Sequence, residues 1–199
     1  MGFVERVLWR TFGLPTGLLG RMGGKIMAGR RQREIAERVV ELLEVRQGET
    51  VLEIGFGPGI GIECVERRLL GVGLVVGIDP SEVMLKAAKA RNARAIGAGT
   101  VSLLSGTVER IPYRDAFFDK AYAMNSFHLW PDPVTGLKEV RRVLKPEGTL
   151  VLSFYGPARR AVTREQVLGT LRQAGFVETT DLERDAVTFW VARKGRSAM

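Results

Sequence analysis

The stretch Val51-Leu-Glu-Ile-Gly-Phe-Gly-Pro-Gly59 joins an apolar run to three alternating glycines, and a helix-competent segment, residues 60–70, follows it. This pattern predicts a buried strand, a tight turn and a helix. The glycines suit such a turn because a residue without Cβ reaches unusual backbone angles and lets a ligand approach the main chain. Glu53, at the end of the strand, indicates a charged or hydroxylated partner for the turn.

The composition is that of one ordinary globular domain. The chain has 199 residues, of which 45% are hydrophobic and 26% charged, and its mean hydropathy is +0.02. No apolar run is long enough for a transmembrane helix. A single cysteine, Cys64, excludes an internal disulfide and a multi-thiolate metal site, and a single histidine, His128, argues against a histidine-built one. We therefore expect no bound metal.

The basic charge balance leaves two explanations open. The net charge is +8 and the pI about 10.1. An anionic partner such as nucleic acid, a lipid headgroup or an acidic small molecule would account for it, and so would a proteome that is basic throughout. Charge alone does not choose between them.

The first segment, residues 1–31, mixes apolar and basic residues and is interrupted by Gly-Leu-Pro-Thr-Gly and Met-Gly-Gly, which predicts short helices joined by turns. It matches a secretory signal poorly because Glu5 and Arg10 interrupt its apolar region. Two roles remain. The segment is either a helical lid over the active site, which we favour, or a basic amphipathic element that contacts a membrane surface.

Beyond residue 31, segments with helical spacing alternate with short apolar runs. Helices are expected at residues 32–44, 60–70, 81–94, 134–144 and 163–174, and strands at 50–54, 74–78, 101–104, 118–124, 149–154, 176–182 and 186–193. This alternation predicts an α/β fold, a doubly wound, mainly parallel seven-stranded sheet with helices on both faces, as one domain over residues 32–195. In such sheets ligands bind beyond the carboxyl ends of the strands, beside the turn that follows the first strand.

The glycine turn does not match the dinucleotide fingerprint Gly-x-Gly-x-x-Gly. Counted from Gly55, the third glycine of that pattern falls on Ile60, and counted from Gly57 it falls on Ile62. A pyrophosphate is also disfavoured beside the Glu53 carboxylate. A cofactor without phosphate fits the turn better.

Residues 32–155 resemble the class I S-adenosylmethionine-dependent methyltransferases, whose fold is Rossmann-like, and within them the small-molecule branch of methyltransferase type 11 and quinone-biosynthesis type enzymes. Glu53-Ile-Gly-Phe-Gly-Pro-Gly59 is similar to the first motif of that family. Asp79 follows the second strand, as the family's acidic residue does. Gly106-Thr-Val-Glu109 and Leu144-Lys-Pro-Glu-Gly-Thr149 resemble two later segments in the same order.

The resemblance implies S-adenosylmethionine as the cofactor and a set of residues that bind it. Asp79 would accept hydrogen bonds from the two ribose hydroxyls, and Met84 would pack against the adenine. The implied cofactor residues are Glu53, Gly55, Phe56, Gly57, Pro58, Gly59, Asp79, Pro80, Met84, Thr107, Val108 and Asn125. Thr107 departs from the family, which usually has Asp there, so the adenine contact would be weaker or come from the backbone.

Methyl transfer requires alignment of donor and acceptor above all, and a general base only for acceptors that carry a proton. The candidate base is His128, in the loop after the fourth strand, and the alternative is that His128 only packs between its aromatic neighbours. Phe127, His128, Trp130 and Tyr155 are expected to line the acceptor site. Phe127 and Trp130 could equally cap the edge of the sheet.

The expected activity is methyl transfer to a small molecule, apolar or lipid-like, in the cytoplasm or at a membrane that residues 1–31 contact. The loop Asn125-Ser-Phe-His128 lacks the Asn/Asp-Pro-Pro-Tyr/Phe signature of enzymes that methylate nucleic acid bases, so a nucleic acid partner is not expected. Two alternatives stay open. The chain could bind the cofactor as a regulatory or scaffold protein, or its basic surface could dock on RNA for methylation.

Overall fold

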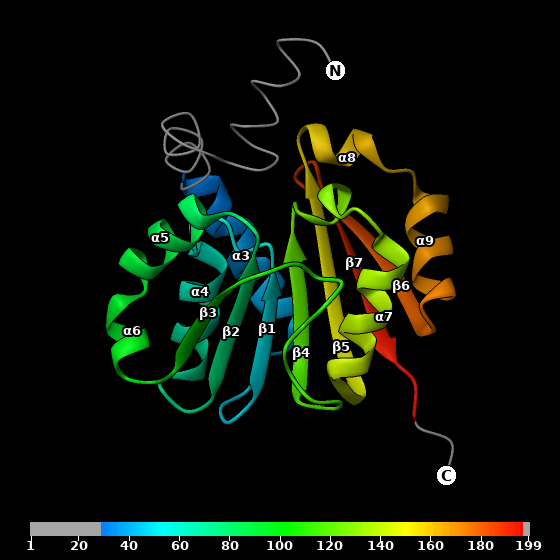
Figure 1. Ribbon diagram of the computed structural model, residues 1–199. Helices are drawn as coiled ribbons and strands as arrows, with labels where there is room; N and C mark the ends of the chain where they lie inside the picture. The colour runs from blue at the N-terminus through cyan, green and yellow to red at the C-terminus, as the bar shows by residue number, and fades with distance from the viewer. Residues whose placement is uncertain (1–28, 197–199) are drawn as a thin grey trace.

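Seven strands form one sheet in the computed structural model, which describes residues 29–196 (Figure 1). Their order is β3-β2-β1-β4-β5-β7-β6, and only β7 runs antiparallel to its neighbours β5 and β6. The predicted doubly wound, mainly parallel sheet is confirmed. The strands are β1 Thr50–Ile54, β2 Leu74–Asp79, β3 Val101–Ser105, β4 Phe118–Met124, β5 Leu144–Tyr155, β6 Phe176–Arg184 and β7 Val187–Lys194.

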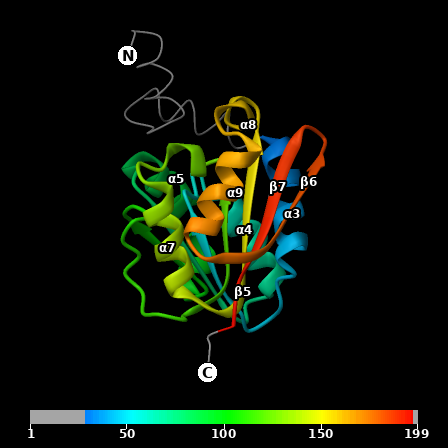
Figure 2. The same cartoon turned by 90° about the vertical axis from the view of Figure 1, so that its right-hand side faces the viewer.

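Helices cover both faces of the sheet, and alternate residues of each strand supply the two cores. In β1, Val51 packs with α3, α4 and α5, whereas Leu52 and Ile54 pack with α7, α8 and α9. Figure 2 shows α3 on one side of β5 and α7 and α9 on the other. The helices are α3 Arg30–Leu43, α4 Ile60–Leu69, α5 Glu82–Arg91, α6 Ala93–Gly97, the 3₁₀ helix η2 Phe127–Leu129, α7 Pro133–Val143, α8 Pro157–Ala161 and α9 Arg164–Gln173.

Two predicted helices end earlier than expected. The helix predicted over residues 81–94 ends at Arg91, because Asn92 leaves the helical conformation (φ −102°, ψ 19°) before α6 begins. The helix predicted over residues 134–144 ends at Val143, because Leu144 is already extended and pairs with Phe118. Strand β5 therefore begins before Pro146-Glu147-Gly148.

The predicted N-terminal lid comprises residues 1–31, and residues 1–28 of it lie outside the described residues. Helix α3 begins at Arg30. That domain boundary and the lid role stay predictions. Among residues 29–196, no helix is both long enough and apolar enough to cross a membrane.

Candidate active site

The glycine turn after β1 adopts backbone angles that glycine tolerates. Gly55, Gly57 and Gly59 have φ values of 72°, 51° and 81°. A Cβ on Gly55 would lie 2.5 Å from the Cβ of Ser126, whose hydroxyl donates to the Ile54 carbonyl at 2.7 Å. The loop after β4 therefore contacts the glycine turn directly, and a larger residue at position 55 would push the loop and the turn apart.

Asp79, at the end of β2, connects the glycine turn to α5. Its Oδ2 accepts the backbone N–H of Gly57 at 2.9 Å, and its Oδ1 accepts that of Ser81 at 2.8 Å. Burial raises the pKa of Asp79 to about 6, although both backbone bonds lower it. Each oxygen of an ionised carboxylate accepts about two hydrogen bonds, so both oxygens can also receive the hydroxyls of a vicinal diol.

Glu53 is a buried carboxyl beside the first turn of α4. Tyr122 donates its hydroxyl to Oε2 at 2.8 Å, while Oε1 has no hydrogen-bond partner within residues 29–196. Desolvation raises the pKa of Glu53 well above its usual value, and the neighbouring Asp79 raises it further. Because Oε1 is closed off from solvent, a cationic group near the turn would act on Glu53 through its charge, and it would favour the ionised form. The two carboxyls thus fit a ligand that carries both a diol and a positive charge.

The loop after β3 also reaches this edge. The N–H of Gly106 donates to the Asp79 carbonyl at 3.2 Å, which places Thr107, exposed, and Val108, buried, next to the end of β2. Phe56 and Pro58 are buried within the glycine turn.

Three other predicted cofactor residues have different environments. Pro80 is exposed, whereas Met84 is only 1% exposed and belongs to the core between the sheet and α4. Asn125 has a positive φ of 54°, and its Oδ1 accepts the backbone N–H of Tyr155 at 3.0 Å, so its side chain joins the ends of β4 and β5. The individual contacts of the predicted residues with the cofactor stay predictions.

The aromatic residues after β4 are largely buried. The rings of Phe127 and Trp130 lie 5.0 Å apart, and Phe127 meets Phe154 edge to face at 5.8 Å. Phe127 and Trp130 are 4% and 9% exposed and belong to the core under α7 and α8. They therefore belong mainly to the core next to the carboxyl end of β4. Their contact with an acceptor stays a prediction.

His128 is half-buried in η2, and its Nδ1 has no hydrogen-bond partner in the described part of the chain. Desolvation lowers the pKa of His128, which keeps the imidazole neutral at pH 7. A neutral imidazole nitrogen can accept a proton. Tyr155, also predicted to line the site, instead shares a hydrogen bond with Gln32 of α3, and burial raises its pKa to about 12.

Four residues that shape the site were missed by the sequence interpretation. Tyr122 and Ser126 contact β1 from β4 and from the loop after it, and Arg91 and Asn92 contact the glycine turn from α5. An asparagine near the end of a predicted helix is a weak local signal for a cap. The other three have no local signal, because their partners lie 33 to 72 positions away.

Residues 52–152 match the family described as a methyltransferase domain, and this range contains the glycine turn, Asp79 and the loop after β4. The chain belongs to this methyltransferase family. It is a class I S-adenosylmethionine-dependent methyltransferase. The predicted family, enzyme class and cofactor are confirmed. S-Adenosylmethionine carries a ribose diol, an ammonium group and a sulfonium that supplies the activated methyl group, which fits the pair Asp79 and Glu53.

Several known proteins resemble the methyltransferase. It is 32% identical over 168 residues to the uncharacterized methyltransferase YdaC of Bacillus subtilis, covering 81% of this chain and 89% of that protein. It is 33% identical over 156 residues to the nocamycin O-methyltransferase of Saccharothrix syringae, covering 78% of this chain and 55% of that protein. It is 31% identical over 126 residues to the demethylmenaquinone methyltransferase of Geobacillus kaustophilus, covering 63% of this chain and 53% of that protein.

A solved structure shows the same fold. The S-adenosylmethionine-dependent methyltransferase of Aquifex aeolicus superposes with a TM-score of 0.77 at 24% identity, covering 87% of this chain and 97% of that one.

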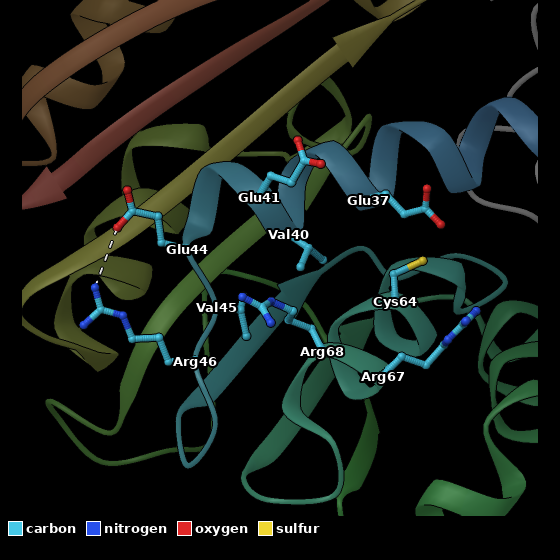
Figure 3. Close-up of a pocket in the computed structure, with 9 residues that line it drawn as sticks. All are labelled: Glu37, Val40, Glu41, Glu44, Val45, Arg46, Cys64, Arg67 and Arg68. Atoms are coloured by element: carbon cyan, nitrogen blue, oxygen red, sulfur yellow. Dashed lines mark ion pairs between the residues drawn. The ribbon is translucent and has the colours of Figure 1, made fainter.

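A separate groove of about 880 Å³ lies between α3 and α4 (Figure 3). Glutamates from α3 line one side, and Arg67 and Arg68 of α4 line the other. The groove extends to Arg46, close to the amino end of β1, whereas the glycine turn follows the carboxyl end of β1. The groove is therefore separate from the predicted cofactor site.

Proposed function

We propose that the methyltransferase acts on an uncharged, apolar small molecule that binds beyond the carboxyl ends of β4 and β5. One observation carries this proposal. Residues 121–131 and 149–158, which contain those two strand ends, include no Asp, Glu, Lys or Arg. The glycine turn and Asp79, on the other side, would hold the cofactor.

The absence of charge from these two segments has an energetic consequence for the acceptor. A charged acceptor that left water for this edge would lose its hydration without gaining a counter-charge from either segment. An apolar acceptor gains from burial there. The names of two relatives, the nocamycin O-methyltransferase and the demethylmenaquinone methyltransferase, also point to small organic molecules.

The methyltransferase would act mainly by alignment. When bound, S-adenosylmethionine would supply an activated methyl group, and the protein would have to hold the cofactor and the acceptor in line and exclude water. For a hydroxyl acceptor, the neutral imidazole of His128 would take the proton.

A matched acceptor panel tests the proposal. S-Adenosylmethionine with a labelled methyl group would be incubated with neutral phenols and quinols, with the same compounds bearing a carboxylate, and with RNA at two salt concentrations. We expect labelling of the neutral members and at least ten times less labelling of their carboxylated counterparts. Labelling confined to charged compounds, or to RNA in a strongly salt-dependent way, would refute it.

The role of His128 is tested separately. With a hydroxyl acceptor, His128→Ala should lower kcat by about 10²-fold or more while leaving the calorimetric affinity for S-adenosylmethionine nearly unchanged. The wild-type rate should rise with pH as the imidazole loses its proton, at a pH below the usual histidine pKa. Leu129→Ala, on the same 3₁₀ turn, is the matched control for packing. Unchanged turnover in His128→Ala would remove this residue from the mechanism.

A further inference from the structure

The last turn of α5 contacts the carbonyl side of the glycine turn. Arg91 donates its Nε–H to the carbonyl of Pro58 at 2.9 Å. Asn92 donates its side-chain amide to the carbonyl of Gly59 at 3.1 Å and to that of Ala88 at 3.0 Å. Asn92 is only 4% exposed, so its amide has no ready access to water as an alternative partner.

This contact is close as well as polar. A Cβ on Gly59 would lie 2.7 Å from the Asn92 amide nitrogen and 2.8 Å from the Cβ of Ala88. At its other end, α5 is preceded by Asp79, which accepts the N–H of Gly57. The glycine turn is thus held from both ends of one helix, through an N–H at Gly57 and through carbonyls at Pro58 and Gly59.

Arg91 is itself held in place by charge. Its Nη1 lies 3.3 Å from the Glu63 carboxylate of α4, and the same carboxylate receives two hydrogen bonds, each 3.1 Å, from Arg33 of α3. The chain of contacts Arg33, Glu63, Arg91 therefore joins three helices and ends on the Pro58 carbonyl. One carboxylate between two guanidinium groups restricts both side chains more than a single exposed pair would.

The direction of a carbonyl decides the direction of the N–H in the same peptide. The Gly59 carbonyl accepts the Asn92 amide at 3.1 Å and also the backbone N–H of Glu63 at 3.2 Å. Because the peptide bond is planar and trans, this direction of the carbonyl points the N–H of Ile60 the opposite way. Ile60 is the first residue of α4, where the N–H groups have no partner inside the helix. Asn92 thus reinforces a direction that the first turn of α4 also sets for the Gly59 carbonyl, while Arg91 holds the Pro58 carbonyl.

We propose that Arg91 and Asn92 are positioning residues for the cofactor, which hold the glycine turn in its binding conformation before S-adenosylmethionine arrives. Neither residue is assigned a contact with the cofactor or the acceptor. Without these two side chains the turn samples other conformations, and only a fraction of the molecules can bind the cofactor. The apparent affinity for S-adenosylmethionine then falls in proportion to that fraction. The inference rests on the cofactor alone and not on the identity of the acceptor.

The experiment compares single variants by calorimetry with S-adenosylmethionine and by hydrogen exchange. Arg91→Ala removes a bond from a charged donor, and we expect its Kd to rise roughly 10-fold to 100-fold. Asn92→Asp keeps the size of the side chain but lacks the donor, and it should weaken binding by a similar factor. Lys89→Ala, an exposed substitution on the same helix, is the control and should bind normally.

Hydrogen exchange separates positioning from a general loss of stability. In Arg91→Ala the amides of residues 55–61 should exchange faster without cofactor and regain their protection when it is bound, while the rest of the sheet stays unchanged. Arg91→Lys, which keeps the charge beside Glu63 and supplies one donor, should restore part of the affinity. The proposal is overturned if folded Arg91→Ala binds with wild-type Kd, and this variant suffices because its side chain is 30% exposed and its removal leaves the core intact.

Discussion

Replacing Glu53 with Gln should make the cofactor-free protein more stable at neutral pH and weaken its affinity for S-adenosylmethionine. Glu53 is 1% exposed, and among residues 29–196 Tyr122 is the only side chain that donates to it. Its ionised form is therefore poorly compensated, and burial raises its pKa well above the usual 4.5. The substitution keeps an oxygen that can accept from Tyr122 but removes the charge.

The direction in which stability changes with pH depends on whether the folded or the unfolded state holds the Glu53 proton more tightly. Because its pKa is raised by folding, Glu53 keeps its proton in the folded state at pH values where the unfolded chain has already lost it. Stability then falls as pH rises from the unfolded pKa toward the folded one, by about 1.4 kcal/mol per pH unit for one proton. Glu53→Gln has no such proton, so its stability relative to the wild type should grow with pH across this window.

Urea unfolding of both proteins at pH 5, 6 and 7 measures this difference. Asp79 titrates in both proteins, so its contribution largely cancels when the two curves are subtracted. A useful contrast is Tyr122→Phe, which leaves the carboxyl and removes its donor, and which should cost about 1–3 kcal/mol. Parallel stability curves for the wild type and Glu53→Gln would refute the reasoning, as would unchanged calorimetric affinity for the cofactor.

Three further predictions concern neighbouring residues. Because the pKa of Asp79 is about 6, affinity for S-adenosylmethionine should fall between pH 7 and pH 5 as the carboxylate gains a proton, and calorimetry with Asp79→Asn should show weak, pH-independent binding instead. Gly61→Ala should lower the free energy of unfolding by about 1–3 kcal/mol, since its Cβ would lie 2.5 Å from Glu53 Oε1, whereas Gly97→Ala, with open space around it, should not. Burial raises the pKa of Cys64 to about 11, so iodoacetamide at pH 8 should label it only after unfolding, and rapid labelling of the folded protein would contradict this.

The elements next to the cofactor could be predicted because their signals are local. The glycines at positions 55, 57 and 59 have the positive φ values that the turn requires, and Ser81 caps α5 by accepting the N–H of Met84. Each of these features depends on residues within a few positions of one another. The same holds for the apolar runs of the seven strands.

The environment of the acceptor end could not be predicted in the same way. Phe127 and Trp130 were expected to line a pocket or cap the sheet. Phe127 instead packs on Phe154 of β5, and Trp130 packs on Phe127. His128 was a candidate base because of its position after β4. The state of its imidazole depends on the desolvation that the fold produces around it.

The sequence by itself determined the class of fold and the place of the glycine turn, because these depend on short patterns of glycine, apolar and acidic residues. Through the family resemblance that these patterns carry, it also implied the cofactor. Only the tertiary structure decided that Glu53 shares its buried site with Tyr122, 69 positions away, and that Arg91 and Asn92 hold the turn from α5. The physical reason is distance along the chain. Desolvation and hydrogen bonding act between groups that are close in space, and the folding of the sheet and its helices creates that proximity.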